Sequence, residues 1–241
     1  GSQRIGDILN QRYKVIRLLA EGEYGQTYLV IDEQKADKPK CVIKQIQLKS
    51  NNPLVWEEAK RLFETEAQVL FNLGKNYQIP EILGEFEEDG AFYLVQEYID
   101  GENLSQEIAR GKFNETKAKE LLKDVIDILQ VVHQETFHLD IKPCNLIRRT
   151  RDGKIVLIGF GSIKQISYLV ISDRGEFSYS KLVGTPGYMP PEQSSREPSP
   201  SHDLYALGMT IIHALTGIFP AELGTAPETG EIGWRNHTQV S

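Results

Sequence analysis

Short alternations of apolar and polar residues dominate the first hundred positions. Residues 13–19 and 26–31 alternate loosely and are rich in β-forming side chains, and the stretch between them holds Gly22 and Gly25. This pattern predicts two strands joined by a glycine-bearing turn. Three further strands are expected at 41–46, 82–86 and 92–99, with an acidic turn at 87–90 between the last two.

Helical spacing of apolar residues appears once in this first part and becomes dominant after position 100. It predicts helices over 56–73 and 118–132, and a buried helix over 204–215, which is apolar on nearly every side. The Ser-rich stretch 162–182 predicts irregular structure, and the tail from 219 has no periodicity. We therefore expect an α+β fold of two lobes, residues 13–99 and 100–241, after a tag scar and N-terminal lead at 1–12.

Composition narrows the class of protein. The chain has 241 residues, 40% of them hydrophobic, and a net charge of −7, which argues against a nucleic-acid surface. The most apolar run, 204–219, is interrupted by polar residues and is too short to span a membrane. Two cysteines make neither a disulfide framework nor a zinc site, and no signal peptide is evident, so we expect a cytoplasmic protein.

Two charged residues stand out in the first part. Lys44 interrupts an apolar strand and needs an anion if it is buried, although a solvated surface lysine remains an alternative. Glu66 lies beside the apolar face of the 56–73 helix and is the obvious partner, with an exposed glutamate as its alternative. Glycines such as Gly22 and Gly25 let backbone N–H groups approach a phosphate, but they also suit an ordinary hairpin turn.

The stretch 137–161 holds the densest chemistry. Asp140, Lys142 and Asn145 stand at short, fixed offsets in a turn-prone segment, and a hairpin-like pair of apolar runs leads from them to Gly159. An acid, a cation and an amide so close together suit a site that positions a hydroxyl group against a phosphate.

Taken in order, these features resemble the protein kinase signature, from residue 13 to about 234. The phrases FYLVQEYI (92–99) and VGTPGYMPPEQ (183–193) resemble bacterial Ser/Thr kinases of the cyanobacterial type. The resemblance implies a two-lobe kinase fold with a β-rich first lobe that carries one helix and a helical second lobe. It also implies ATP or another adenine nucleotide as ligand and a protein as partner or substrate, with no nucleic acid.

The resemblance implies a role for each matching residue. The nucleotide-binding set is Gly22, Gly25, Thr27, Lys44, Glu66, Glu97, Ile99 and Ile147. Within it, Lys44 held by Glu66 would contact the α- and β-phosphates, and the backbone of Glu97 and Ile99 would bind adenine next to the gatekeeper Gln96.

The same resemblance assigns the catalytic loop. Asp140 would accept the substrate's hydroxyl proton, Lys142 would neutralise the γ-phosphate and Asn145 would hold one Mg²⁺. Residues with structural or regulatory roles would be His138, Phe160, Thr185, Glu192 and Asp203.

The chain departs from the family pattern at its main metal ligand. Gly159 stands where the aspartate of the Asp-Phe-Gly motif would bind Mg²⁺, and glycine offers no ligand. Ala20 replaces the first glycine of the phosphate loop, and Leu139 replaces an arginine that would pair with a phosphorylated activation segment. The sequence also ends before the family's last helices, so the second lobe is expected to be truncated.

These departures favour a nucleotide-binding pseudokinase that works without Mg²⁺ and signals by conformation or as a scaffold. Two alternatives remain open. One is an impaired but active Ser/Thr kinase, because Asp140, Lys142 and Asn145 are intact. The other is a scaffold that binds no nucleotide, because Glu21 and Glu23 would repel a triphosphate.

Overall fold

The computed structural model describes residues 3–190, 197–224 and 231–240. It divides the chain into two compact units, one made of residues 1–99 with 162–182 and the other of residues 100–161 with 183–241. Ile99 ends the first stretch of the first unit, and Asp100 begins the second unit. Residues 162–182, which we expected in the second lobe, belong to the first unit.

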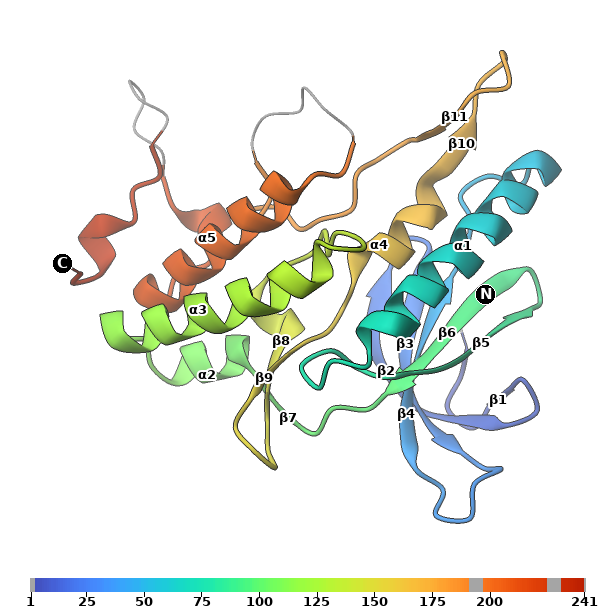
Figure 1. Cartoon of the computed structure of the whole chain (residues 1–241), viewed down its shortest axis with the longest axis horizontal. Helices are drawn as coiled ribbons and strands as arrows, with labels where there is room; N and C mark the ends of the chain where they lie inside the picture. The colour runs from blue at the N-terminus through green and yellow to red at the C-terminus, as the bar shows by residue number, and fades with distance from the viewer. Residues whose placement is uncertain (1–2, 191–196, 225–230, 241) are drawn as a thin grey trace. The chain divides into compact units, whose positions relative to one another are not determined.

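The first unit is built on a six-stranded antiparallel sheet in the order β1-β2-β3-β4-β6-β5 (Figure 1). Its strands are β1 (Ile8–Leu9), β2 (Tyr13–Gly22), β3 (Gly25–Asp32), β4 (Lys40–Ile46), β5 (Ile82–Glu88) and β6 (Ala91–Glu97). β2 and β3 run further into the glycine stretch than expected and leave only two residues in the turn. Alternate positions of β2, β3, β4 and β6 form a buried cluster that also takes in Leu9 of β1, so part of the N-terminal lead belongs to the sheet.

Helix α1 (Pro53–Leu73) packs on β5 and β6 in the same unit. It begins as its sequence requires, because the side chain of Asn52 accepts a hydrogen bond from the Leu54 N–H and Pro53 fits the first helical position. Its buried residues are Val55, Ala59, Phe63, Ala67, Leu70 and Leu73.

The segment 162–182 is ordered, and the expectation of irregular structure was wrong. A helical turn, α4 (Gly161–Lys164), and a 3₁₀ turn (Gln165–Tyr168) lead into a hairpin of β10 (Leu169–Ile171) and β11 (Phe177–Tyr179). The 3₁₀ turn and β10 pack on α1 (Figure 1). The Ser-rich sequence does not predict this structure, because the structure depends on contacts with α1 that the local sequence pattern does not encode.

The second unit is mainly helical. Helices α2 (Leu104–Arg110), α3 (Glu115–Val132) and α5 (Pro200–Thr216) accompany a small sheet of β7 (Gly101–Asn103), β8 (Leu146–Arg149) and β9 (Ile155–Leu157), in the order β7-β8-β9. Helix α3 packs on α5 and β9 (Figure 1). β8 and β9 are the expected hairpin-like pair of runs.

Helix α5 and the tail of the second unit were described only in outline by the sequence pattern. Helix α5 is less enclosed than its sequence suggests, because Leu204 is 54% exposed while Leu207 and Met209 are buried. The tail contains short 3₁₀ turns at Pro220–Glu222 and Arg235–His237. Across the described stretches of the chain, no helix combines the length and the apolar character that a membrane crossing requires.

Candidate functional site

The loop of residues 138–145, here called the Asp140 loop, is held by one buried carboxylate. Asp203, on the first turn of α5, accepts hydrogen bonds from the backbone N–H groups of His138 and Leu139, each at 2.8 Å. Its Oδ2 also lies 2.8 Å from His133 Nε2. Burial alone would raise the pKa of Asp203, but these hydrogen bonds outweigh burial and lower it. Asp203 thus acts as the expected anchor, while sequence reasoning missed His133.

The anchor holds an unfavourable backbone in place. Leu139 has φ 74°, a left-handed conformation that costs a non-glycine residue roughly 1 kcal/mol or more. The Leu139 N–H donates to Asp203, and the next N–H, that of Asp140, donates to His138 Nδ1. Hydrogen bonds on both sides of the strained residue therefore fix the direction of the Asp140 side chain. No local signal in the sequence marks this conformation.

His138 joins the Asp140 loop to the turn that precedes Gly159. Its Nδ1 accepts the Asp140 N–H at 3.0 Å, so the proton lies on Nε2, which donates to the Ile158 carbonyl at 2.8 Å. The ring is fully buried and lies 4.5 Å from the ring of Phe160, centroid to centroid. His138 and Phe160 are therefore structural residues of this turn.

A hydroxyl group bridges the expected acid and cation. Thr185 Oγ1 donates to Asp140 Oδ1 at 2.7 Å and accepts from Lys142 Nζ at 2.8 Å. Lys142 Nζ also lies 3.6 Å from Asp140 Oδ2. The Asp140 side chain is only 11% exposed, so this network is largely shielded from water. A hydroxyl, a carboxylate and an ammonium group in mutual contact match the geometry that positions a hydroxyl for proton removal.

Asn145 packs on Gly159. Its Nδ2 donates to the Asp140 carbonyl at 2.8 Å and lies 3.5 Å from Asp140 Oδ2. Gly159 has φ +71°, and a Cβ atom added there would stand 2.2 Å from Asn145 Oδ1. The Asn145 amide thus lies where a side chain at 159 would begin.

In the first unit, the strand register places Lys44 between two neighbouring strands. Thr27 of β3 and Leu94 of β6 pair with it on either side, and Lys44 is 4% exposed. Lys44 is therefore buried, as the pattern indicated, and the surface alternative was wrong. Gly25 is the first residue of β3. A Cβ atom added there would lie 2.0 Å from the Gln45 carbonyl oxygen, so the close packing of this residue on β4 already requires glycine.

Glu66 is half-buried on α1. Burial raises the pKa of Tyr179, and the negative charges of Glu66 and Glu58 raise it further. At the other end of the segment, Tyr168 meets Tyr24 edge-on with ring centroids 5.6 Å apart. Tyr24 lies in the turn between Gly22 and Gly25, so the segment contacts the expected phosphate loop. Sequence reasoning missed this contact.

The remaining expected residues are distributed over both units. Ile99 is buried at the end of the first unit, and the Glu97 N–H bonds the Glu81 carbonyl at 2.8 Å. Ile147 belongs to β8 of the second unit and pairs with Asn103. Glu192 lies outside the described residues.

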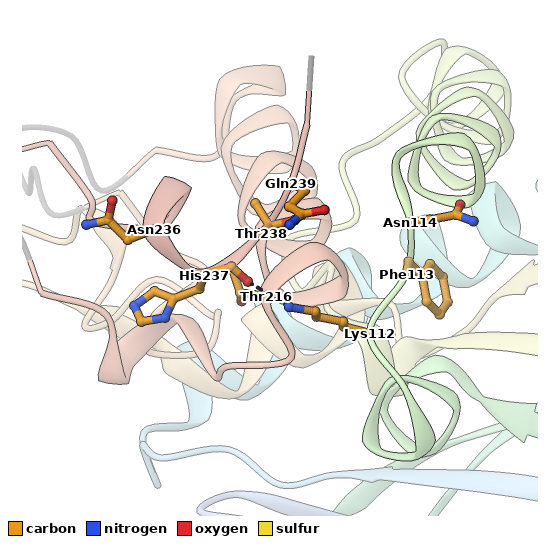
Figure 2. A pocket seen from close by; sticks show the side chains of 8 residues that line it. All are labelled: Lys112, Phe113, Asn114, Thr216, Asn236, His237, Thr238 and Gln239. Atoms are coloured by element: carbon orange, nitrogen blue, oxygen red, sulfur yellow. Dashed lines mark hydrogen bonds between the residues drawn. The ribbon is translucent and has the colours of Figure 1, made fainter.

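A pocket of about 750 Å³ occurs elsewhere in the second unit (Figure 2). It is lined by residues 112–114, Thr216 and residues 236–239, and Lys112 Nζ bonds the His237 carbonyl at 3.2 Å. None of the residues expected from the sequence to form the site lines it.

The model of the protein kinase domain matches residues 13–240. The chain is 42% identical over 238 residues to serine/threonine-protein kinase B of Synechocystis, covering 97% of this chain and 42% of that protein. It is 40% identical to serine/threonine-protein kinase PknA of Nostoc, covering 95% of this chain and 41% of that protein. The chain thus spans about two fifths of the length of these relatives. Among solved structures, the PknI kinase domain of Mycobacterium tuberculosis (C20A mutant) superposes with a TM-score of 0.64 at 23% identity, over 91% of this chain and 79% of that one.

Proposed function

Because the chain belongs to the protein kinase family, we propose that it is a nucleotide-binding pseudokinase. It binds ATP or another adenine nucleotide without Mg²⁺ and signals to a protein partner in the cytoplasm through its conformation or as a scaffold. The observation that carries the proposal is Gly159, which replaces the metal-binding carboxylate and has Asn145 packed on its Cα.

The residues present do not fit the Mg²⁺ site that the family implies. In the described parts of the chain, no group of three or more His, Cys, Asp or Glu side chains could hold a metal ion. The amide of Asn145 is turned toward Asp140 through its nitrogen and against Gly159 through its oxygen. Mg²⁺ needs near-ideal octahedral oxygen ligands, so no step of the function is assigned to it.

Nucleotide binding rests on groups that the chain retains. Lys44 is buried, and a buried ammonium group that meets a phosphate gains far more than an exposed one. We propose that Lys44, with Glu66, holds the α- and β-phosphates, that Gly22, Gly25 and Thr27 border them, and that the hinge from Glu97 to Ile99 holds adenine. The contact between Tyr168 and Tyr24 offers the conformational output, because phosphates at this loop would disturb it.

Thermal unfolding with ATP tests the proposal. We expect ATP in EDTA to raise the unfolding midpoint, because a ligand that binds only the native state stabilises it. Lys44→Ala removes the phosphate contact and abolishes the rise, whereas Lys14→Ala, at an exposed lysine of β2, keeps it. Stabilisation that strictly requires Mg²⁺ would overturn the metal-free proposal.

A second candidate, an impaired Ser/Thr kinase, is favoured by the bridge from Asp140 through Thr185 to Lys142. Those groups still position a hydroxyl group. Within the described network, the carboxylate that the Thr185 hydroxyl contacts directly is that of Asp140. Transfer of radiolabelled phosphate from ATP to a protein hydroxyl, lost in Asp140→Asn, would establish this activity. The absence of ATP binding at millimolar concentration in calorimetry would instead support a scaffold independent of nucleotide, as Glu21 and Glu23 suggest.

A further inference from the structure

A tyrosine and a histidine connect helix α5 to the turn that carries Thr185, whose hydroxyl group bridges Asp140 and Lys142. We propose that neutral His213 keeps this bridge closed through Tyr188, and that protonation of His213 opens it. Mild acid then releases the Thr185 hydroxyl from both charged groups. The device acts on the bridge itself, so it does not depend on nucleotide binding.

Thr185 begins a tight turn that fixes its position relative to Tyr188. The Tyr188 N–H donates to the Thr185 carbonyl at 3.0 Å, and between them stand Pro186 and Gly187, which has φ +94°. Proline at the second position and a positive φ at the third are typical of a type II β-turn. Proline also fixes one backbone angle of this turn. A movement of Tyr188 is therefore passed on to Thr185.

The side chain of Tyr188 is held by His213. Its hydroxyl group lies 2.6 Å from His213 Nδ1, and Tyr188 is only 3% exposed. The ring of Phe219 lies edge-on to both rings, with centroids 5.6 Å from Tyr188 and 6.1 Å from His213. A hydroxyl group so shielded from water needs an acceptor for its proton. We therefore assign the tyrosine as the donor and Nδ1 as the acceptor, which places the proton of neutral His213 on Nε2.

Protonation of His213 reverses this hydrogen bond. A charged imidazole ring carries a proton on each nitrogen, so Nδ1 becomes a donor and directs its N–H at the Tyr188 oxygen. The hydroxyl proton of Tyr188 then loses its acceptor. An unpaired donor is unfavourable in a buried place, so the Tyr188 side chain has to turn away. The closed turn takes Thr185 with it, and the contacts with Asp140 and Lys142 are lost.

The surroundings of His213 set the pH at which this happens. Burial lowers the pKa of His213, and the charge of Glu222, on the 3₁₀ turn that packs against α5, raises it by less. Burial raises the pKa of Tyr188, and the charge of Cys144 raises it further, so the tyrosine keeps its proton near neutral pH. His213 is therefore neutral at pH 7 and becomes charged only below its ordinary value of 6.5.

Other charged side chains beside α5 are engaged away from His213. Helix α3 packs on α5, and its end leads to His133, which bonds Asp203 in the first turn of α5. Lys112, which precedes α3, donates through Nζ to the His237 carbonyl at 3.2 Å. The titration of His213 should thus report its own bond with Tyr188 and the charge of Glu222.

Nuclear magnetic resonance of the Thr185 methyl group tests the proposal between about pH 5 and pH 8. In the native chain the signal should move with one midpoint below 6.5, at the pH at which the His213 ring titrates. His213→Phe removes the acceptor, so its Thr185 signal should stay at the acidic position at every pH. His213→Asn offers an uncharged oxygen close to the place of Nδ1 and should hold the signal at the neutral position.

A second histidine of α5 provides the matched control. His202, in the first turn, accepts the Ser199 N–H through Nδ1 at 3.1 Å, and His202→Asn should leave the titration of Thr185 unchanged. In Tyr188→Phe, His213 should still titrate while Thr185 no longer follows it. A native Thr185 signal that does not follow His213, or one that keeps its full movement in His213→Asn, would overturn the proposal.

The native chain alone gives a further test, which does not require any variant to fold. Long-range ¹H–¹⁵N spectra at pH 7.5 distinguish the two neutral forms of a histidine ring. They should show the proton of His213 on Nε2, and a proton on Nδ1 would overturn the proposal. None of these measurements contains a nucleotide, so failure of the proposed ATP binding would not affect them.

Discussion

The Asp140 loop and the segment 162–182 are both irregular stretches that the fold holds in a defined shape, but by different means. The loop depends on one buried charge, that of Asp203. Its carboxylate accepts hydrogen bonds from two backbone N–H groups and is hydrogen-bonded to His133. The segment depends on the packing of its 3₁₀ turn and β10 against α1, together with the edge-on pair of Tyr168 and Tyr24. A structure that rests on one strong centre should fail with a single substitution, whereas one held by distributed weak contacts should lose only part of its order.

The largest effect is expected at the centre of the loop. Asp203→Ala leaves the buried N–H groups of His138 and Leu139 without their acceptor, and each such loss costs about 1–3 kcal/mol. We expect the free energy of unfolding to fall by about 3–5 kcal/mol, measured by urea denaturation.

Asp127→Ala serves as the control for that prediction. Asp127 is an exposed carboxylate on α3 that pairs with Lys123 one turn away at 3.2 Å, and removing it should change stability little. A similar small loss in both variants would show that the loop does not depend on Asp203 as its centre.

Acid should weaken the loop through the same carboxylate. The pKa of Asp203 is lowered from its ordinary value of 3.8 because its hydrogen bonds outweigh its burial. A carboxyl group with a lowered pKa stabilises the fold fully above its unfolded value and loses that contribution as pH falls through its folded value. The difference in unfolding free energy between the native chain and Asp203→Asn should therefore be constant above about pH 5 and shrink below pH 3.8.

Urea titrations of both proteins across this range measure that difference. A gap that stays constant down to the lowest pH at which both proteins fold would contradict the role assigned to the ionised carboxylate. The loop would then depend on the shape of Asp203 rather than on its charge.

The two regions also differ in how well the sequence predicts them. Asp140, Lys142 and Asn145 are recognisable because their chemistry is local and their offsets are short, and α1 and α3 follow from the 3.6-residue spacing of their apolar side chains. The segment 162–182 has no such period. Its short helical turns and the β10–β11 hairpin are stable only against α1, so tertiary packing decides them.

Some features of the site itself lie beyond local pattern for the same reason. The left-handed backbone of Leu139 is favourable only because Asp203, 64 residues away, accepts its N–H. The packing of Asn145 on Gly159 depends on the turn around Gly159. Hydrogen bonds from the Ile158 and Gly161 N–H groups join this turn to the Asp140 loop. The sequence predicts a missing ligand at Gly159, whereas the fold shows that the Asn145 amide lies where a side chain at this position would begin.

The smallest effect is expected in the segment. Tyr168→Leu keeps an apolar side chain but removes the edge-on contact with Tyr24 and the contact with Lys181, whose Nζ lies 5.6 Å from the Tyr168 ring centroid. Such contacts are worth about 0.5–1.5 kcal/mol, so overall stability should change little. Hydrogen exchange of the 162–182 backbone should nevertheless become faster while exchange in the Asp140 loop stays the same. Leu204→Ala, at a leucine of α5 that is 54% exposed, should alter neither. If Tyr168→Leu instead released the whole segment at a cost as large as that of Asp203→Ala, the segment too would depend on a single centre, and the contrast between the two regions would be lost.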